Sequence, residues 1–416
     1  MLSRRRFILH SSSLISLSPL VPTMLCRAAQ AAPLEADGKV LVVIQLDGGN
    51  DGLNTVVPYA DDGYAKARVK LRLETRELHK LDDHVGLHPR MKSAKALFDD
   101  GRLAIVQSVG YPNPDKSHFR SMRIWQTASM DDAAHNAYGW LGQALDRSVT
   151  ERASGEAAAI YVGEEQTPVA LWGRRSAATA LSRLDDLTLT RSDTWPRLSE
   201  TRGASLRHGE SLIGEPRPPV TDSVRQFVTR QVLSAYAAAE QFRRQELATR
   251  QNQPSKYPDN ALAGRLELIS KLLKSGSRSR VFYTAQSGYD THASQLQTQA
   301  NLLGEVSSSL KAFLDDLKDA KLDDRVLVLA FSEFGRRVEE NDSRGTDHGT
   351  AGPVLLAGPA VTPGLHGKTP SLADLSGSDL KSSIDFREVY ATVLDKWLGL
   401  PAPDSLTKFK ELPILR

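Results

Sequence analysis

Acidic residues and histidines gather in three short, glycine-containing stretches of the sequence. These are DGGNDG at 47–52, SGYDTH at 287–292 and GTDHGT at 345–350. Divalent cations bind carboxylate and imidazole groups together, so the stretches offer ligands for one or two ions. The candidate ligands are Asp47, Asp51, Asp290, His292, Asp347 and His348. We expect a divalent metal, with zinc favoured and calcium, magnesium or manganese as alternatives.

Each stretch taken alone also has a purely structural interpretation. Asp-Gly is an ordinary turn signal, and an aspartate at the end of a strand often caps a helix. In that interpretation Asp347 and His348 lie in a surface turn, and Asp347→Ala costs about 1 kcal/mol at most. A metal site is the better hypothesis because all three stretches lie at or after the ends of expected strands, where an open α/β sheet usually binds its ligands.

A nucleophile is expected between residues 111 and 121, in the stretch YPNPDKSHFRS. Ser117 stands before a helix-like segment, where a serine either caps the helix or presents its hydroxyl where backbone N–H groups favour an anion. His118 is the adjacent catalytic candidate, and Arg336 or Arg120 is expected to pair with an anionic group. Glu333 is expected to be either a further ligand or an acceptor that orients a histidine.

The elements that must position these residues alternate between apolar strands and helical patterns. Strands are expected at 39–49, 102–110, 280–290, 325–335 and 352–361, with strong helical patterns between several of them. Continuous apolar runs of this kind belong to a sheet covered on both faces. The alternation predicts an α/β fold, a three-layer sandwich with a mainly parallel central sheet. Residues 150–222 are rich in Ser, Arg, Thr and Pro, and we expect them to form a less regular cap or insertion.

The N-terminus resembles an export signal. Residues 3–7 read SRRRF, the pattern of a twin-arginine signal, and an interrupted apolar stretch leads to the small-residue site Ala29-Gln30-Ala31. Cleavage after Ala31 is expected, which would leave a domain at 32–416 in the periplasm or outside the cell. The apolar run is shorter than the about 20 residues that a membrane span needs.

Removal of this signal changes what the composition allows. The only cysteine, Cys26, would be lost, which excludes disulfides, thiolate metal sites and cysteine nucleophiles. The full chain has 53 Lys+Arg and 50 Asp+Glu, but four of the basic residues and none of the acids lie in the signal. The remaining domain is nearly neutral, so no nucleic-acid partner is expected.

Several long motifs together resemble an exported family of unknown function, domain-of-unknown-function family 1501. They include IQLDGGNDGLNTVVPY, GYPNPDKSHFRSMRIWQT, SGYDTHASQ, FSEFGRR, GTDHGTAGPVLLAG and DFREVYATVLDKWLG. That family is similar in pattern to the alkaline phosphatase and sulfatase superfamily. The resemblance implies an alkaline-phosphatase-like fold, Asp47 as first-strand ligand, Ser117 as nucleophile, and Asp290 with His292 and Asp347 with His348 as later ligands. It also offers His366 as a final histidine. One departure is the single residue between Asp290 and His292, where the superfamily usually has three.

Two functions remain open from the sequence. The first is a periplasmic metal-dependent hydrolase that acts on a small anionic phosphate or sulfate ester, or on a glycan. The second is a non-catalytic periplasmic binding or envelope-assembly protein that retains the fold and works with an envelope partner protein. No stable membrane span is expected after cleavage of the signal. Fold does not fix reaction, so the arrangement of the candidate ligands must decide between the two.

Overall fold

The computed structural model describes residues 38–131, 138–147, 157–176, 178–182 and 255–416. The expected signal peptide, its cleavage site and Cys26 lie outside these residues. So does most of the segment 150–222. The part of that segment that is described forms strands β6 (Ala159–Val162) and β7 (Ala178–Leu181), with the short helix η4 (Val169–Leu171) between them. A cap over the core therefore stays a prediction.

Nine strands of the described residues form one central sheet. The principal strands are β1 (Val40–Asp47), β5 (Leu103–Gly110), β8 (Val281–Ser287), β9 (Val326–Phe331) and β10 (Gly352–Ala357). Their order across the sheet is β11-β5-β10-β9-β1-β8-β6-β7, where β11 is Gly364–His366, and β14 (Ile384–Asp385) also pairs with β5. All pairs are parallel except those of β10, which runs antiparallel to β5 and β9. The five predicted strands are confirmed.

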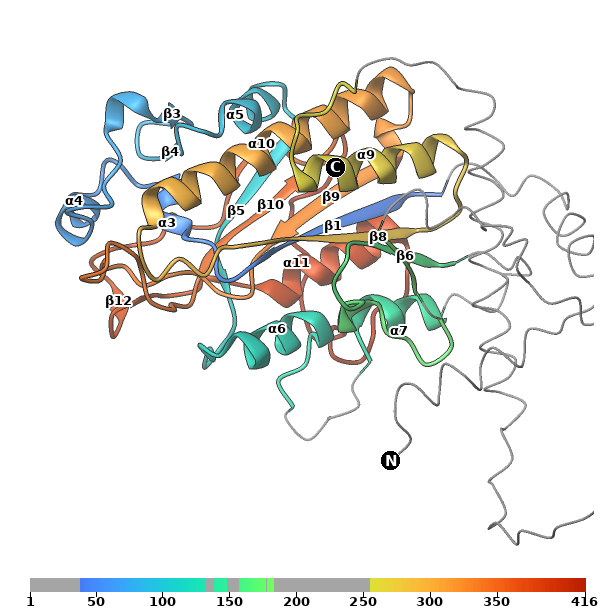
Figure 1. The fold of residues 1–416 in the computed structure, drawn as a ribbon. Helices are drawn as coiled ribbons and strands as arrows, with labels where there is room; N and C mark the ends of the chain where they lie inside the picture. The colour runs from blue at the N-terminus through green and yellow to red at the C-terminus, as the bar shows by residue number, and fades with distance from the viewer. Residues whose placement is uncertain (1–37, 132–137, 148–156, 177, 183–254) are drawn as a thin grey trace, which may run out of the picture.

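Helices cover both faces of the sheet (Figure 1). One face carries α5 (Lys92–Asp99), α9 (Ala261–Lys274) and α10 (Gln295–Asp319). The other carries α6 (His118–Thr127), α7 (Trp140–Arg147), α11 (Phe386–Thr392) and the π-helical turn η7 (Val393–Leu398). The predicted three-layer α/β sandwich with a mainly parallel sheet is therefore confirmed.

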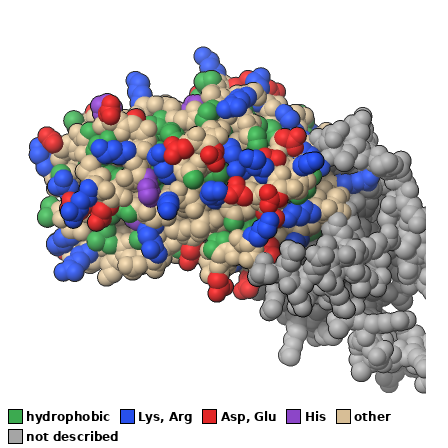
Figure 2. Space-filling model, turned by 90° about the horizontal axis from the view of Figure 1, so that it is seen from above, with side chains coloured by type: hydrophobic (Ala, Val, Ile, Leu, Met, Phe, Trp, Pro, Cys, Tyr) green, Lys and Arg blue, Asp and Glu red, His purple; other side chains and the backbone are tan. Residues whose placement is uncertain are grey.

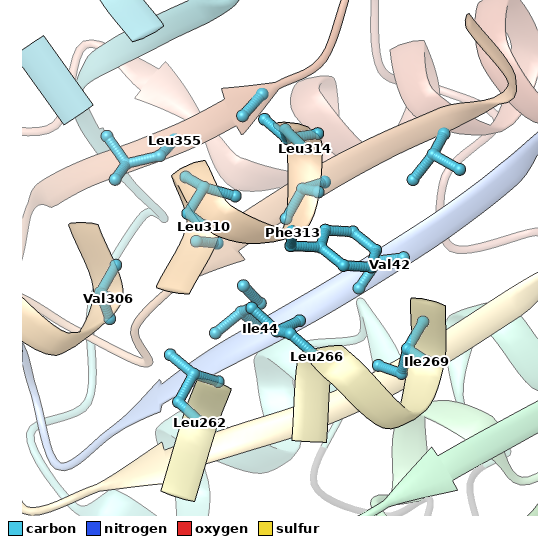
Figure 3. Packing of buried hydrophobic residues seen from close by; sticks show 14 of the residues in the cluster. Val42, Ile44, Leu262, Leu266, Ile269, Val306, Leu310, Phe313, Leu314 and Leu355 are labelled. Carbon is cyan, nitrogen blue, oxygen red and sulfur yellow. The ribbon is translucent and has the colours of Figure 1, made fainter. Parts of the chain in front are cut away.

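The side-chain alternation of β1 explains why both faces need helices. Val42 and Ile44 belong to the core beneath α9 and α10, whereas Leu41 and Val43 belong to the core on the α6 and α11 side. Figure 3 shows Val42 and Ile44 against side chains of α9 and α10. A strand apolar on both faces cannot leave either face in water without a large loss of hydrophobic burial.

Small elements complete the end of the sheet where β1 stops. Helices α3 (Gly52–Thr55) and α4 (Asp62–Ala67) follow β1, and β2 (Val56–Val57), β4 (Gly86–Leu87) and β3 (His79–Lys80) form a small second sheet. The hairpin of β12 (Leu375–Ser376) and β13 (Asp379–Leu380) is separate, and the short helices η2 (Thr75–Glu77) and η6 (Asp323–Arg325) connect larger elements.

Basic and acidic side chains are interspersed on the face seen from above (Figure 2), in line with the small net charge. Among the described residues, no helix combines the length and the apolar character that crossing a bilayer requires.

Candidate metal centre

The polar loops meet at the carboxyl ends of β1, β5, β8 and β9. Asp290 and His292 follow β8, Glu333 and His348 follow β9, and His118 begins the helix that follows β5. These strands point the same way, because β10 inserts antiparallel between β5 and β9. Loops from distant parts of the chain therefore lie at one edge of the sheet, where open α/β sheets bind ligands.

The Nε2 atoms of three histidines lie close to one carboxylate oxygen, Oδ1 of Asp290. It lies 3.0 Å from Nε2 of His292, 3.1 Å from Nε2 of His348 and 3.4 Å from Nε2 of His118. The ligand atoms of His118, Asp290 and His348 all lie within 4.8 Å of one another. Carboxylate and imidazole atoms in this proximity are a typical ligand set for one divalent ion.

Hydrogen bonds at Nδ1 leave the Nε2 atoms of His118 and His348 available to a metal. Nδ1 of His348 lies 2.7 Å from the carbonyl oxygen of Lys116, which can only accept, so this nitrogen carries the proton. Nδ1 of His118 lies 2.8 Å from Oε1 of Glu333. Such outer partners fix the tautomer and orientation of metal-binding histidines. In this structure Glu333 contacts the ring of His118, the arrangement expected of an orienting acceptor.

Two further features of these nitrogens fit a cation between them. Nε2 of His118 is buried and makes no hydrogen bond with any described residue. Nε2 of His292 lies 2.8 Å from Nε2 of His348, and two neutral acceptor nitrogens at that separation repel each other unless a proton or a cation lies between them. The donor set of His118, Asp290 and His348, two imidazoles and one carboxylate, suits zinc, and its nitrogen content disfavours calcium and magnesium.

Local charges and burial shift the pKa values of three groups in the cluster. Partial burial opposes ionisation of Asp290, but bonds from Arg336 and His348 keep the pKa of this carboxyl well below its usual range. The hydrogen bond to Glu333 raises the pKa of His118, and burial lowers the pKa of His348. The neutral form of His348, which is the form that binds a metal, is thus favoured.

Arg336 is buried, and its side chain hydrogen-bonds the loops around the cluster. Its side chain donates to the carbonyl oxygens of Gly48, Gly49, Tyr289 and Thr346, and to Oδ1 of Asp290 at 2.7 Å. Because the residue is only 1% exposed, contact with a substrate anion would require breaking these bonds. The neighbouring Arg337 is half-buried, and its side-chain Nε has no hydrogen-bond partner among the described residues.

Ser117 occupies the N-cap position of α6, directly before His118. Its side chain makes no capping hydrogen bond to that helix, although its backbone N–H donates to Asp115 at 2.7 Å. The residue is exposed. Of the two roles considered for Ser117, the capping bond is thus not made; the residue stands at the N-terminus of α6, directly before the candidate ligand His118. His118, expected to act in catalysis, lies among the candidate ligands instead.

The other predicted ligands surround the cluster at different distances. Asp347 lies behind His292, with Oδ1 3.4 Å from its Nδ1, and a hydrogen bond from Asn341 lowers the pKa of Asp347. Asp47 is half-buried at the end of β1, where burial and the nearby Glu333 raise its pKa. Both are placed to influence the cluster without belonging to the group within 4.8 Å.

Asp51, His88 and His366 lie elsewhere. The carboxylate of Asp51 is fully buried and forms a two-pronged ion pair with Arg68, so a role as metal ligand would require Asp51 to leave that pair. His88 is 3% exposed, and burial lowers its pKa to about 4. His366 lies in the edge strand β11 with Nε2 2.7 Å from the carbonyl of Thr362.

Sequence reasoning missed the residues that hold the ligands. Asn341, Arg68, Gln295 and the carbonyl of Lys116 had no distinguishing pattern. The glycines after β1 carried a stronger signal: Gly48 has φ of 120°, and a Cβ there would lie 2.4 Å from the backbone nitrogen of Asp290. Only glycine permits both this conformation and this approach.

Comparison with known proteins gives one family match. Residues 38–414 match the family described as "Protein of unknown function (DUF1501)". A search of curated proteins finds no match.

Several solved structures are similar at low identity. The C-terminal periplasmic domain of EcEptC from Escherichia coli, in a complex with Zn, is 9% identical, with 89% of this chain and 85% of that chain covered and a TM-score of 0.42. A putative sulfatase from Bacteroides thetaiotaomicron is 9% identical, with 90% and 74% covered and a TM-score of 0.40. An alkaline phosphatase superfamily protein from Vibrio parahaemolyticus is 10% identical, with 90% and 69% covered and a TM-score of 0.39. Similarities of this size do not identify a reaction.

Proposed function

This chain belongs to the DUF1501 family of proteins of unknown function, and from that premise we propose that it is an exported, metal-dependent hydrolase of phosphate or sulfate esters. The observation that supports the proposal most is the convergence of three imidazole Nε2 atoms on Oδ1 of Asp290, at 3.0, 3.1 and 3.4 Å. Export through the twin-arginine pathway is part of the proposal and rests on the pattern of residues 3–7.

The residues of the cluster would hold one divalent ion, with zinc as the preferred metal. When bound, the ion would neutralise anionic charge and polarise an ester oxygen. Glu333 and the carbonyl of Lys116 orient His118 and His348, so that their Nε2 atoms face Asp290. Arg336 fixes Asp290 and does not meet the substrate.

Ser117 is the proposed nucleophile. In the first step its Oγ forms a bond to the phosphorus or sulfur atom and its hydroxyl proton is lost, while the bond to the ester oxygen breaks and the leaving alcohol gains a proton. Water then hydrolyses the serine ester and restores the hydroxyl. The N-terminal N–H groups of the ten-residue helix α6 favour the negative charge of the transferred group.

The test separates metal binding from turnover. The purified protein is stripped with a chelator, reloaded with zinc, manganese, magnesium or calcium, and assayed on an aryl phosphate and an aryl sulfate. Ser117→Ala is expected to abolish turnover and to keep the metal, whereas the matched variant Ser308→Ala, on α10, retains both.

A protein that binds metal but cleaves neither ester would favour the alternative, a periplasmic binding or envelope-assembly protein. Full activity in Ser117→Ala would contradict the role of this serine.

A further inference from the structure

Three fully buried polar side chains are hydrogen-bonded to one another and form what we call the Gln295 junction: Asp51, Arg68 and Gln295. Nη1 of Arg68 donates to Oδ2 of Asp51 at 2.5 Å, and Nη2 donates to Oδ1 at 3.0 Å. Nε2 of Gln295 donates to the same Oδ2 at 2.5 Å. The second aspartate of the DGGNDG stretch is therefore engaged here and not at the cluster.

The amide of Gln295 joins loops that follow three different strands. Its Oε1 accepts from Oγ1 of Thr346 at 2.6 Å and from Oγ1 of Thr291 at 3.1 Å. Its Nε2 must face Asp51, because a carboxylate can only accept. One side chain thus holds the loops after β1, β8 and β9 in a fixed relation.

Two of these contacts are made by immediate neighbours of the candidate ligands. Thr291 stands between Asp290 and His292, and Thr346 comes directly before Asp347 and His348. The backbone N–H of Thr346 also donates to the carbonyl of Thr291 at 3.2 Å. A displacement at Gln295 would therefore reach both ligand loops through a single intervening residue.

Arg68 extends the junction to the loop after β9. Its Nε donates to the carbonyl of Val338 at 2.6 Å and Nη2 donates to the carbonyl of Arg337 at 2.8 Å. Every nitrogen of this buried guanidinium has a partner. A buried ion pair is weak evidence for stability, because well-packed apolar residues often replace one without loss. Its satisfied and directional contacts suit the fixing of geometry better.

We propose that Gln295, supported by Asp51 and Arg68, is a positioning residue for the metal centre: it sets the distance between the loop that carries Asp290 and His292 and the loop that carries His348. This inference rests on the proposed function in one respect, namely that the cluster binds a metal. It adds that the affinity for the metal depends on side chains that never touch it.

The experiment compares Gln295→Met with the milder variant Thr346→Val in the full chain. Met keeps the length of the side chain and removes its amide, and Val removes one hydroxyl with little change of shape. The control is Ser270→Ala on α9, where a fully buried hydroxyl donates to Oδ2 of Asp316 at 2.6 Å, in a separate polar cluster. Zinc affinity is measured by competition with a chelator.

We expect Gln295→Met to weaken zinc binding by about 10-fold, the lower end of the effect of losing a direct partner of a ligand, because Gln295 bonds the neighbours of the ligands and not the ligands themselves. Thr346→Val should weaken it less, and Ser270→Ala should leave it within about twofold of the wild type. If zinc affinity in Gln295→Met equals that of the control, the proposal is overturned, whatever the loss of stability.

Hydrogen exchange of the metal-free proteins supplies an independent readout. The amides of residues 289–292 and 343–348 should exchange faster in Gln295→Met than in Ser270→Ala. If the wild type binds no zinc, the proposed function fails and this comparison decides the positioning role alone. Equal exchange of those two loops in both variants would then overturn it.

Discussion

Replacement of Glu333 by glutamine tests whether a buried carboxylate prepares His118 for a metal. Glu333 is completely buried and its Oε1 accepts from Nδ1 of His118 at 2.8 Å and from the N–H of Gly48 at 2.9 Å. Oγ of Ser332 lies 3.0 Å from Oε2 and already donates to the carbonyl of Leu46. Glu333→Gln can therefore keep Oε1 in place and donate from its new amide to Ser332, so the variant is expected to fold.

The expected loss follows from the charge alone. A hydrogen bond to a charged group contributes about 1.5–3 kcal/mol, and a neutral one contributes about 1 kcal/mol. The difference of about 0.5–2 kcal/mol corresponds to a metal affinity that is roughly 2- to 30-fold weaker. In the metal-free protein, the pKa of His118 should fall, because the anion that raises it is gone.

The same variant has a defined effect on stability against pH. The pKa of His118 in the folded protein is raised above the ordinary value of 6.5. Its contribution is therefore fully present below the unfolded pKa and is lost as the pH rises through the folded pKa. Glu333→Gln should remove this part of the profile.

Zinc competition measures the affinity, and NMR titration of the imidazole measures the pKa. Glu305→Gln is the control, because Glu305 is a half-buried residue of α10 that bonds Gln286 at 2.9 Å. Unchanged zinc affinity together with an unchanged pKa of His118 in Glu333→Gln would refute the reasoning.

Three further predictions concern the frame of the site. Burial lowers the pKa of His88 to about 4 in the folded chain, so the unfolded chain takes up a proton first as the pH falls below about 6.5. About 3 kcal/mol of stability should therefore be lost by pH 4. Denaturant titrations at several pH values should show that His88→Gln flattens this dependence of stability on pH. Gly48→Ala should cost about 1–3 kcal/mol and weaken metal binding, because φ of 120° and the contact with Asp290 both exclude a Cβ; unchanged stability and affinity would contradict this. Arg336→Lys should lower the free energy of unfolding by about 2–4 kcal/mol, since several buried carbonyls lose their donor. The control Arg337→Lys, at a half-buried neighbour, should change it by about 0.5 kcal/mol or less. Equal losses in the two variants would refute the role of Arg336 in holding the loops.

The fold was predictable because its signals are local. The five long strands are mainly apolar, and a run such as 40–47 can be buried only between two layers of helices. The direction of β10 was not predictable, because an apolar run reads alike in parallel and antiparallel pairs. Residues 150–222 showed weak periodicity, and the strands β6 and β7 within them were missed.

The candidate ligands were only partly predictable. Asp290, His292 and His348 follow strands within short, glycine-containing stretches, so their residue types and positions indicated a site. Sequence position did not distinguish Asp51 from Asp47, because the partner that engages Asp51 is Arg68, a residue in no recognisable motif. Likewise, the separation of His118 from Glu333 in sequence hid their hydrogen bond, which depends on the order of strands in the sheet.

Elemental analysis of the purified, exported protein tests the central claim most directly. The account predicts about one equivalent of a divalent metal per chain, zinc above the others, and a marked loss in His348→Gln. The matched variant His366→Gln should retain the metal, because His366 lies in strand β11 and bonds the carbonyl of Thr362. A wild-type protein without divalent metal, or equal metal content in both variants, would contradict the account.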